Sequence, residues 1–193
     1  MRRVGRPFVD QPVGDSFPAA DRENGPKIQA PGRRSWRMDE TYIKVKGIWK
    51  YLYRAVDKHG KTVDFLLTAK RNMAAAKRFF DKAMGLNGHP DKVAMDKSGA
   101  NKAAMDAINA GRAMQILVRQ VKYINNIVEQ DHRAIKRVTR PMLNFKSFRA
   151  ASSVLAGIEL IHMIRKGQFA IGVTEAMSFA DQFSTLAGLV RSV

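Results

Sequence analysis

The fold of this chain is anchored by the stretch WRMDETYIKV, residues 36–45. Apolar and polar side chains alternate over residues 42–45, and such alternation is typical of a half-buried β-strand. Asp39 places a carboxylate inside this predicted strand. Two further acids, Asp96 and Glu129, lie far downstream in a chain that is otherwise strongly basic. We hypothesise that the fold brings these three carboxylates together.

The charge of the chain indicates a polyanionic partner. Its 193 residues include 34 Lys and Arg against 17 Asp and Glu, which gives a formal net charge of +17. This excess favours nucleic acid, with an anionic membrane surface second and a basic protein without such a partner third. With 45% hydrophobic residues, the chain can bury one core of ordinary size. The lack of cysteine excludes disulfides and thiolate metal sites, and is compatible with a cytoplasmic location.

No stretch of the sequence is predicted to enter a membrane. The most apolar stretch, residues 154–164, contains Glu159 and His162, so it is too short and too polar to span a bilayer. We predict that it forms a buried helix. The arginines near the N-terminus are not followed by an apolar run, so no signal peptide is expected.

The sequence divides into three predicted parts. Residues 1–34 hold five of the seven prolines and show no apolar periodicity, which predicts a flexible leader. Residues 35–170 carry strand and helix patterns and are predicted to form the main domain. Residues 171–193 are predicted to supply a C-terminal amphipathic helix.

The order of the predicted elements favours an α/β fold. Three strands with short turns suggest an antiparallel meander, and the later strands alternate with helices, as in parallel crossovers. A mixed sheet flanked by helices is therefore expected. Asn72 and Ser147 are predicted to cap helices, and Gly85 is predicted to end one. The predicted strands cover residues 36–46, 49–57, 62–69, 92–95 and 115–123, and the predicted helices cover 73–84, 100–110, 127–137, 148–166 and 174–190.

This pattern places the three acids where they can converge. Asp39 lies in the first strand, Asp96 at the end of the fourth, where open α/β sheets place their sites, and Glu129 in the first turn of a helix. Neighbouring carboxylates repel one another unless cations lie between them. Mg²⁺ suits such a site because it is a hard cation that prefers oxygen and keeps waters for substrate phosphates. Taken singly, each acid also fits an ordinary solvent-facing carboxylate.

The helix of Glu129 also carries bases. Helical spacing places an acid at its start and bases after it along one side. Such a stripe can hold a metal and then follow a phosphate backbone, and a solvated helix face is the alternative. The predicted DNA-binding residues here are Lys136, Arg133, His132, Arg137 and Arg140.

Other residues are given structural roles. Strand alternation points Glu40 away from the face of Asp39, so Glu40 is predicted not to face the metals. Trp49, Tyr51 and Tyr53 alternate along the second strand, where one face of a core sheet is favoured over stacking on flipped bases.

The motifs around the acids resemble a known family. From Trp36 to about Leu186, the chain is similar to the catalytic part of DDE-type bacterial insertion-sequence transposases, grouped as the IS six family with IS twenty-six among its members. The segments that carry the resemblance are MDETYIKVKGIWKYLYRAVDKHGKTVDFLLTAKRN, HPDKVAMDKSGANKAA, RQVKYINNIVEQDHRAIKRVTRPMLNFKSFRAA and LAGIELIHMIRKGQ.

The resemblance implies an RNase H-like mixed five-stranded sheet flanked by helices, and a metal-dependent polynucleotidyl transferase. It maps the acids onto Asp39, Asp96 and Glu129 and implies two Mg²⁺ ions, for which Mn²⁺ can substitute. The implied reaction cuts the element ends, the terminal repeats, and joins the freed 3′-hydroxyl to target DNA. The basic residue expected to contact the DNA end is Lys136. A homo-oligomer in the bacterial cytoplasm, associated with the nucleoid, is also implied.

Two alternatives stay open. Members of this family carry a helix-turn-helix before the catalytic core, and residues 1–34 show no such pattern. A truncated, catalytically inactive remnant that binds DNA or full-length transposase is the first alternative. A nuclease that cuts DNA but never joins it is the second.

Overall fold

The fold begins with an antiparallel meander. The computed structural model describes residues 35–121, 126–142, 144–168, 178 and 180–184. Its first strands are β1 (Ser35–Val45), β2 (Ile48–Asp57) and β3 (Thr62–Thr68). The hairpin between β1 and β2 turns at Lys46 and Gly47, whose φ angles are 48° and 77°. Positive φ at both central residues gives a turn whose twist matches that of the flanking strands.

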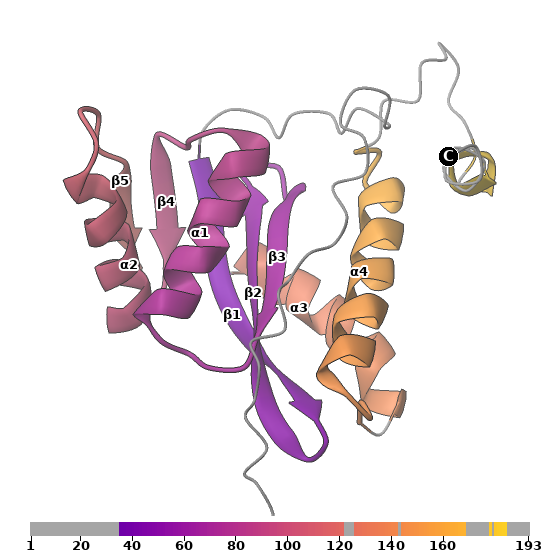
Figure 1. The fold of residues 1–193 in the computed structure, drawn as a ribbon. Coiled ribbons are helices and arrows are strands. Elements are labelled where there is room, and N and C mark those ends of the chain that lie inside the picture. Colours follow the sequence, from indigo (N-terminus) through magenta and orange to yellow (C-terminus); the bar gives the residue numbers. More distant parts are fainter. Residues whose placement is uncertain (1–34, 122–125, 143, 169–177, 179, 185–193) are drawn as a thin grey trace, which may run out of the picture.

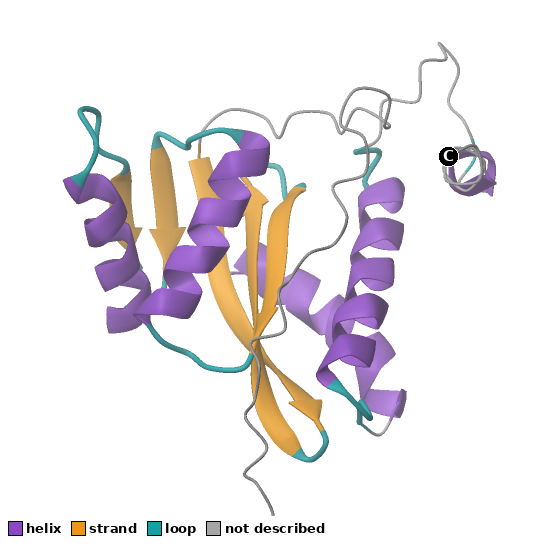
Figure 2. Ribbon diagram, in the orientation of Figure 1, coloured by secondary structure: helices purple, strands orange, loops and turns teal. Residues whose placement is uncertain are grey.

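Two parallel strands complete the sheet. The helix α1 (Met73–Asn87) leads to β4 (Lys92–Met95), and α2 (Gly99–Ala110) leads to β5 (Leu117–Gln120). The strand order is β3-β2-β1-β4-β5, with β4 parallel to both β1 and β5. The structure therefore confirms the predicted α/β class, an RNase H-like mixed five-stranded sheet flanked by helices (Figures 1 and 2).

Helices cover the two faces of this sheet. On one face, Met38 of β1 packs with Phe79 of α1 and Met105 of α2. On the other face lie α3 (Asn126–Thr139), the short 3₁₀ helix η1 (Arg140–Met142) and α4 (Phe148–Arg165), which supply Ile135 and Leu155 to a second core. Successive residues of β1 therefore point alternately into two cores.

Most predicted boundaries lie within three residues of those observed. Asn72 and Ser147 accept the N–H groups of Ala75 and Ala150, which confirms both N-caps. The prediction that Gly85 ends α1 is wrong. The helix continues to Asn87 and closes at Gly88, whose positive φ of 75° is a backbone conformation that favours glycine.

The aromatic residues of β2 have different environments. Tyr53 is fully buried and stacks on Phe79, with ring centroids 5.8 Å apart. Trp49 is 56% exposed. The predicted core face is therefore confirmed for Tyr53 and wrong for Trp49, because the hairpin extends beyond α1 (Figure 1).

Parts of the predicted organisation fall outside the described chain. The predicted leader, residues 1–34, lies there, and the domain boundaries stay predictions. Within the predicted helix over 174–190, residues 180–184 are described and helical. None of the helices in the described ranges has the length and apolar character to cross a membrane.

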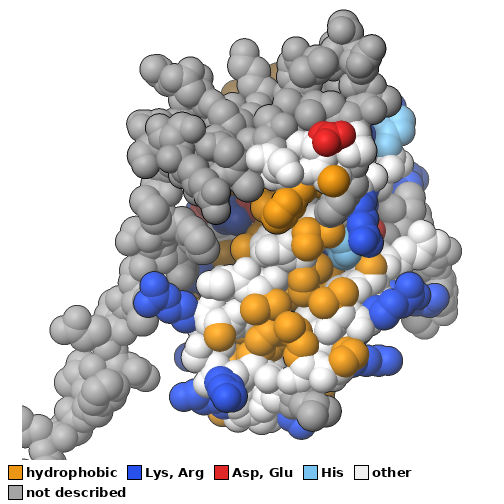
Figure 3. All heavy atoms as spheres, turned by 90° about the vertical axis from the view of Figure 1, so that its right-hand side faces the viewer, with side chains coloured by type: hydrophobic (Ala, Val, Ile, Leu, Met, Phe, Trp, Pro, Cys, Tyr) orange, Lys and Arg blue, Asp and Glu red, His pale blue; other side chains and the backbone are white. Residues whose placement is uncertain are grey.

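One side of the molecule presents an apolar surface framed by bases. It is the side of α4, where Leu160 is 37% exposed. Figure 3 shows apolar side chains gathered at the centre of this view, with Lys and Arg around them. The basic excess of the sequence is thus visible at this surface.

Candidate active site

The sheet places Asp39 beside Asp96. In the parallel pair of β1 and β4, Arg37 lies opposite Ala94, and each acid follows two residues later. Asp96 therefore lies just past the end of β4, as the sequence predicts. Oxygen atoms from the carboxylates of Asp39, Glu40 and Asp96 all lie within 4.8 Å of one another. This spacing allows the three carboxylates to share a cation.

Glu129 approaches the same place from α3. It lies in the first turn of that helix and is exposed. Its negative charge contributes to raising the pKa of Asp39, and one turn later Nδ1 of His132 lies 3.8 Å from Oδ2 of Asp39. The start of α3 therefore faces Asp39. Within the described chain, Glu129 is not one of the three acids whose oxygens lie within 4.8 Å of one another.

The carboxylate of Asp39 lies in an environment that disfavours its charge. Its pKa rises from 3.8 to about 7, chiefly because it is buried, and the negative charges of Glu40, Asp96 and Glu129 raise it further. A hydrogen bond from the backbone N–H of Glu40 opposes this, at 2.9 Å. A divalent cation would relieve the repulsion, and the all-oxygen ligand set fits Mg²⁺.

The predicted face of Glu40 is confirmed, yet its carboxylate lies within the acidic cluster. Alternation does send its side chain to the α1 and α2 face, where Nδ2 of Asn101 donates to Oε2 at 2.8 Å. The same amide also donates to Oδ1 of Asp96, at 3.2 Å. Because Asp96 lies past the end of β4, it meets side chains from both faces of β1. Glu40 therefore joins the acidic cluster although it points away from Asp39.

A cation of the protein already neutralises part of this cluster. The guanidinium of Arg71 pairs with the carboxylate of Glu40 and reaches Oδ2 of Asp96 at 3.4 Å. Sequence reasoning missed both Arg71 and Asn101. Their positions offered only a weak signal, because each lies near the start of a helix that follows a strand. Glu40 is therefore balanced by Arg71, whereas Asp39 has no comparable partner among the contacts of the described chain.

His132 is a neutral neighbour of Asp39. The ring is 5% exposed, and its pKa falls to about 3, first because of burial and then because of the positive charges of Arg54 and Lys136. A neutral imidazole at this position can orient the carboxylate without competing for its charge. Its burial leaves little surface for the predicted DNA contact.

A buried ion network joins α3 and α4 to the sheet. Arg54, opposite Asp39 in the hairpin, is fully buried, and its Nη2 lies 2.8 Å from Oε2 of Glu159 and 3.2 Å from Oδ2 of Asp131. Lys166 reaches the same oxygen of Asp131 at 2.6 Å. Asp131 follows Glu129 by two residues, so this network holds the N-terminal half of α3 against the sheet. Sequence reasoning missed it.

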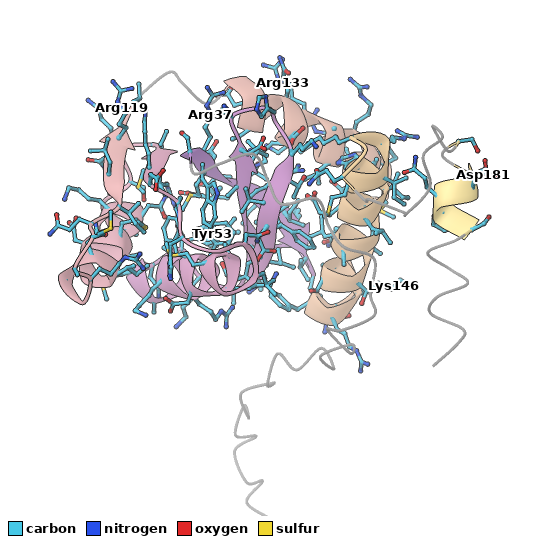
Figure 4. All side chains as sticks on the ribbon, turned by 90° about the horizontal axis from the view of Figure 1, so that it is seen from above. Arg37, Tyr53, Arg119, Arg133, Lys146 and Asp181 are labelled. Atoms are coloured by element: carbon cyan, nitrogen blue, oxygen red, sulfur yellow. The ribbon has the colours of Figure 1, made fainter. Side chains whose placement is uncertain are left out.

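The remaining predicted DNA-binding residues lie at the surface of α3 and η1. Arg133, Arg137 and Arg140 are exposed, and Lys136 is half-buried. Figure 4 shows the side chains of Arg37, Arg119 and Arg133 on the side of the sheet away from α1, whereas Tyr53 points toward α1. Asp39 shares the face of Arg37, because the two residues are separated by one position of β1. The acidic site therefore lies on a basic face.

Comparison with known proteins defines the family. A family model described as a DDE domain matches residues 33–168, and the chain belongs to this family. Its relatives include the Staphylococcus aureus transposases for the insertion sequence-like element IS431mec and for IS257 in transposon Tn4003, each 42% identical over 133 residues. Each match covers 68% of this chain, and the chain spans about 58% of the length of these relatives. The family resemblance inferred from the sequence is confirmed.

Solved structures of similar fold come from retroviral integrases. The HTLV-2 integrase catalytic core domain in complex with magnesium is 19% identical, with a TM-score of 0.48 over 60% of this chain and 74% of that one. The simian T-cell lymphotropic virus intasome in complex with PP2A regulatory subunit B56 gamma is 14% identical, with a TM-score of 0.49 over 80% and 54%. The family assignment rests on the sequence matches rather than on these structures.

The raised pKa of Asp39 predicts a pH-dependent stability of the metal-free protein. The folded-state pKa of about 7 exceeds the ordinary 3.8, so the neutral form is favoured and stability is lost as pH rises from about 4 to 7. Asp39→Asn removes this loss and should raise the free energy of unfolding by about 2 to 4 kcal/mol above pH 7. Urea unfolding in chelator from pH 4.5 to 8 measures the difference.

The matched control is Asp81→Asn on α1, where an exposed carboxylate pairs with Lys77. Its effect should stay within about 0.5 kcal/mol at every pH. If the free energies of unfolding of wild type and Asp39→Asn differ by the same amount from pH 4.5 to 8, the pKa of Asp39 is not raised.

Proposed function

We propose that this chain carries the catalytic domain of an insertion-sequence transposase. It cuts DNA at element ends and transfers the freed 3′-hydroxyl into target DNA. The observation that carries this proposal is the placement of Asp39 and Asp96 side by side, with the start of α3 and its Glu129 facing them on a basic surface. Membership of the DDE-domain family supports the same reaction class.

The acids would hold the metal. Asp39, Asp96 and Glu129 offer carboxylate oxygens from a strand, a strand end and a helix, and we propose that they hold two Mg²⁺ ions, for which Mn²⁺ can substitute. When bound, these ions supply positive charge for the attacking and leaving oxygens of phosphoryl displacement. The carboxylate of Asp39 must lose its proton to bind a cation, which its pKa of about 7 permits in neutral solution.

The basic residues would position the DNA. Arg133 is exposed on α3, the helix of Glu129, so a phosphate bound there lies close to the acids. Lys136, Arg137 and Arg140 continue along α3 into η1, and they would follow the backbone away from the reacting phosphate. Arg37 extends the same surface over the sheet (Figure 4). We propose that element ends and target DNA lie on this face.

Self-association and location follow from the same proposal. The family resemblance implies self-association, so we propose a homo-oligomer that acts on nucleoid DNA in the bacterial cytoplasm. The apolar side chains gathered on the side of α4 offer a surface for self-association (Figure 3).

A joining assay tests the proposed function. Labelled oligonucleotides that carry a pre-cut element end are incubated with the chain, a supercoiled target plasmid and Mg²⁺. The transposase proposal predicts label joined to the plasmid in Mg²⁺ or Mn²⁺ and none in chelator. Nicking without joining identifies the nuclease. Salt-dependent DNA binding with neither activity identifies the non-catalytic DNA-binding protein.

A further inference from the structure

A cavity of about 580 Å³ lies at the hairpin end of β1. Tyr42 and Trp49 of the hairpin form one wall, and Lys136 of α3 with Arg140 of η1 form another. Phe145 also lines it, in a segment that bridges to Val45 beside β1. This cavity lies beyond the residues of β1 that pair with β4, so it is separate from the acidic cluster.

Two aromatic rings at this cavity are open to solvent. Tyr42 is 45% exposed and Trp49 is 56% exposed, and the rings meet edge to face with centroids 6.2 Å apart. Both leave the hairpin on one face, because Tyr42 and Lys44 lie two positions apart on β1 and Trp49 pairs with Lys44. Large apolar rings left exposed beside a cavity mark a binding surface more often than a packing defect.

The charges around the cavity are all positive. Lys44, Lys136 and Arg140 contribute to its lining, and no acid does among the residues that the structure describes there. Nζ of Lys44 lies 5.6 Å from the ring centroid of Trp49, so cationic and aromatic groups are interleaved. Aromatic faces that stack on bases, combined with cations that follow phosphates, are the two elements of single-stranded nucleic-acid binding.

The cavity is connected to the acidic site by two elements. Tyr42 follows Asp39 by three residues of strand, which is about 10 Å, and its side chain leaves β1 on the opposite face, that of Glu40. Lys136 follows Glu129 by seven residues of helix, which is also about 10 Å. Along the axis of a DNA duplex this distance corresponds to about three base-pair steps of 3.4 Å. One strand can therefore reach both places.

We propose that this cavity binds an unpaired base of the substrate DNA about three nucleotides from the phosphate that reacts. The proposal rests on the proposed function, since it places the reacting phosphate at the acids. The base stacks on Trp49, whose ring meets Tyr42 edge to face, and its flanking phosphates contact Lys136 and Arg140. A paired base is held inside the duplex stack, so it must leave the stack to enter a cavity of this size.

Fluorescence of Trp49 tests the proposal directly. The chain has two tryptophans, and Trp36 is 3% exposed in the core, so stacking at the cavity quenches mainly Trp49. In chelator, we expect a duplex with mismatches at its last three base pairs to quench the emission, and to bind at least fivefold tighter than the fully paired duplex. One stacked base contributes about 1 to 3 kcal/mol, which corresponds to a factor of roughly 5 to 150.

Substitutions at Trp49 test whether this residue causes the preference for mismatched DNA. Trp49→Ala should remove the preference for mismatched DNA, and Trp49→Phe should retain the preference while abolishing the quench. Leu86→Ala, a change of a residue 60% exposed on α1, is the matched control and should change neither. Because Trp49 is exposed, these variants should keep the melting temperature of the wild type.

The outcomes separate this inference from the proposed function. Equal quenching and equal affinity with paired and mismatched ends, or a preference that survives Trp49→Ala, overturns the base-binding cavity even if the chain joins DNA. A Trp49-dependent preference in a chain that never joins DNA retains the cavity and overturns the transposase proposal.

Discussion

Asp96→Asn is expected to reduce strand joining about a thousandfold or more while the fold stays intact. The substitution removes one charge from the group of carboxylates that would hold the metal, and metal stabilisation of a phosphoryl transfer is worth several kcal/mol. The amide keeps an oxygen that can accept hydrogen bonds from the N–H of Ser98 and from Nδ2 of Asn101, now at 3.1 and 3.2 Å. The rate of strand joining is measured as the joined product formed per unit time at saturating DNA and Mg²⁺.

The control for this prediction lies on the helix that follows. Asp106 of α2 is exposed and pairs with Lys102 one turn earlier, so Asp106→Asn removes a carboxylate of the same type far from the reaction. Its joining rate should equal that of the wild type. If Asp96→Asn joins DNA at more than a tenth of the wild-type rate with an unchanged melting temperature, Asp96 does not hold the metal.

Arg54→Met is expected to destabilise the fold by about 3 to 5 kcal/mol. Arg54 and Glu159 are both fully buried, and removal of the cation leaves the carboxylates of Glu159 and Asp131 without this partner in a region of low dielectric. The double variant Arg54→Met with Glu159→Gln should recover part of the loss, because no unpaired charge remains at position 159. Urea unfolding at pH 8 measures both.

The destabilisation should depend on pH in a defined direction. Burial raises the pKa of Glu159 to about 7, and the positive charge of Arg54 is the first influence that opposes this. Without Arg54 the carboxyl group takes up its proton more readily, so the loss should be smaller at pH 6 than at pH 8. Lys102→Met, which breaks an exposed ion pair, is the control and should change stability by less than about 1 kcal/mol. A loss independent of pH would show that Glu159 is not the charge that Arg54 balances.

Loss of this network should also affect the site. Asp131 lies two residues after Glu129, and its oxygen contacts both Arg54 and Lys166. When Arg54 is replaced, the N-terminal half of α3 loses one of its attachments to the sheet. Joining by Arg54→Met should therefore fall even at temperatures where the protein remains folded.

Local patterns in the sequence were sufficient for the elements of the fold. Alternation over residues 42–45, the Gly47 turn and the caps at Asn72 and Ser147 depend on contacts within a few residues, so the sequence predicted them correctly. The same holds for Asp96 at the end of β4, because a strand that follows a helix after a strand runs parallel and delivers its end to the site. The position of Asp39 beside it follows from this topology.

Other features depend on where strands and helices stop in space. Glu40 lies close to the other acids because β4 ends before Asp96. Trp49 is exposed because the hairpin extends beyond α1. Alternation assigns a side chain to a face but does not say what covers that face or which groups meet there, so it predicted neither the exposure of Trp49 nor the closeness of Glu40 to Asp96. Arg54 illustrates the same limit, since an arginine in a strand reads as a solvent-facing residue until the partner carboxylates are known.

The sequence by itself determined the family, the order of the strands and helices, and the two strand-borne acids, because these depend on local periodicity and on motifs along the chain. Only the tertiary structure decided which charges are balanced. Arg71 lies against Glu40, Arg54 lies against Glu159, and Asp39 is left among like charges. These pairings join residues from separate elements, and their energies depend on burial and on distances of a few ångströms, which spacing in the sequence does not encode.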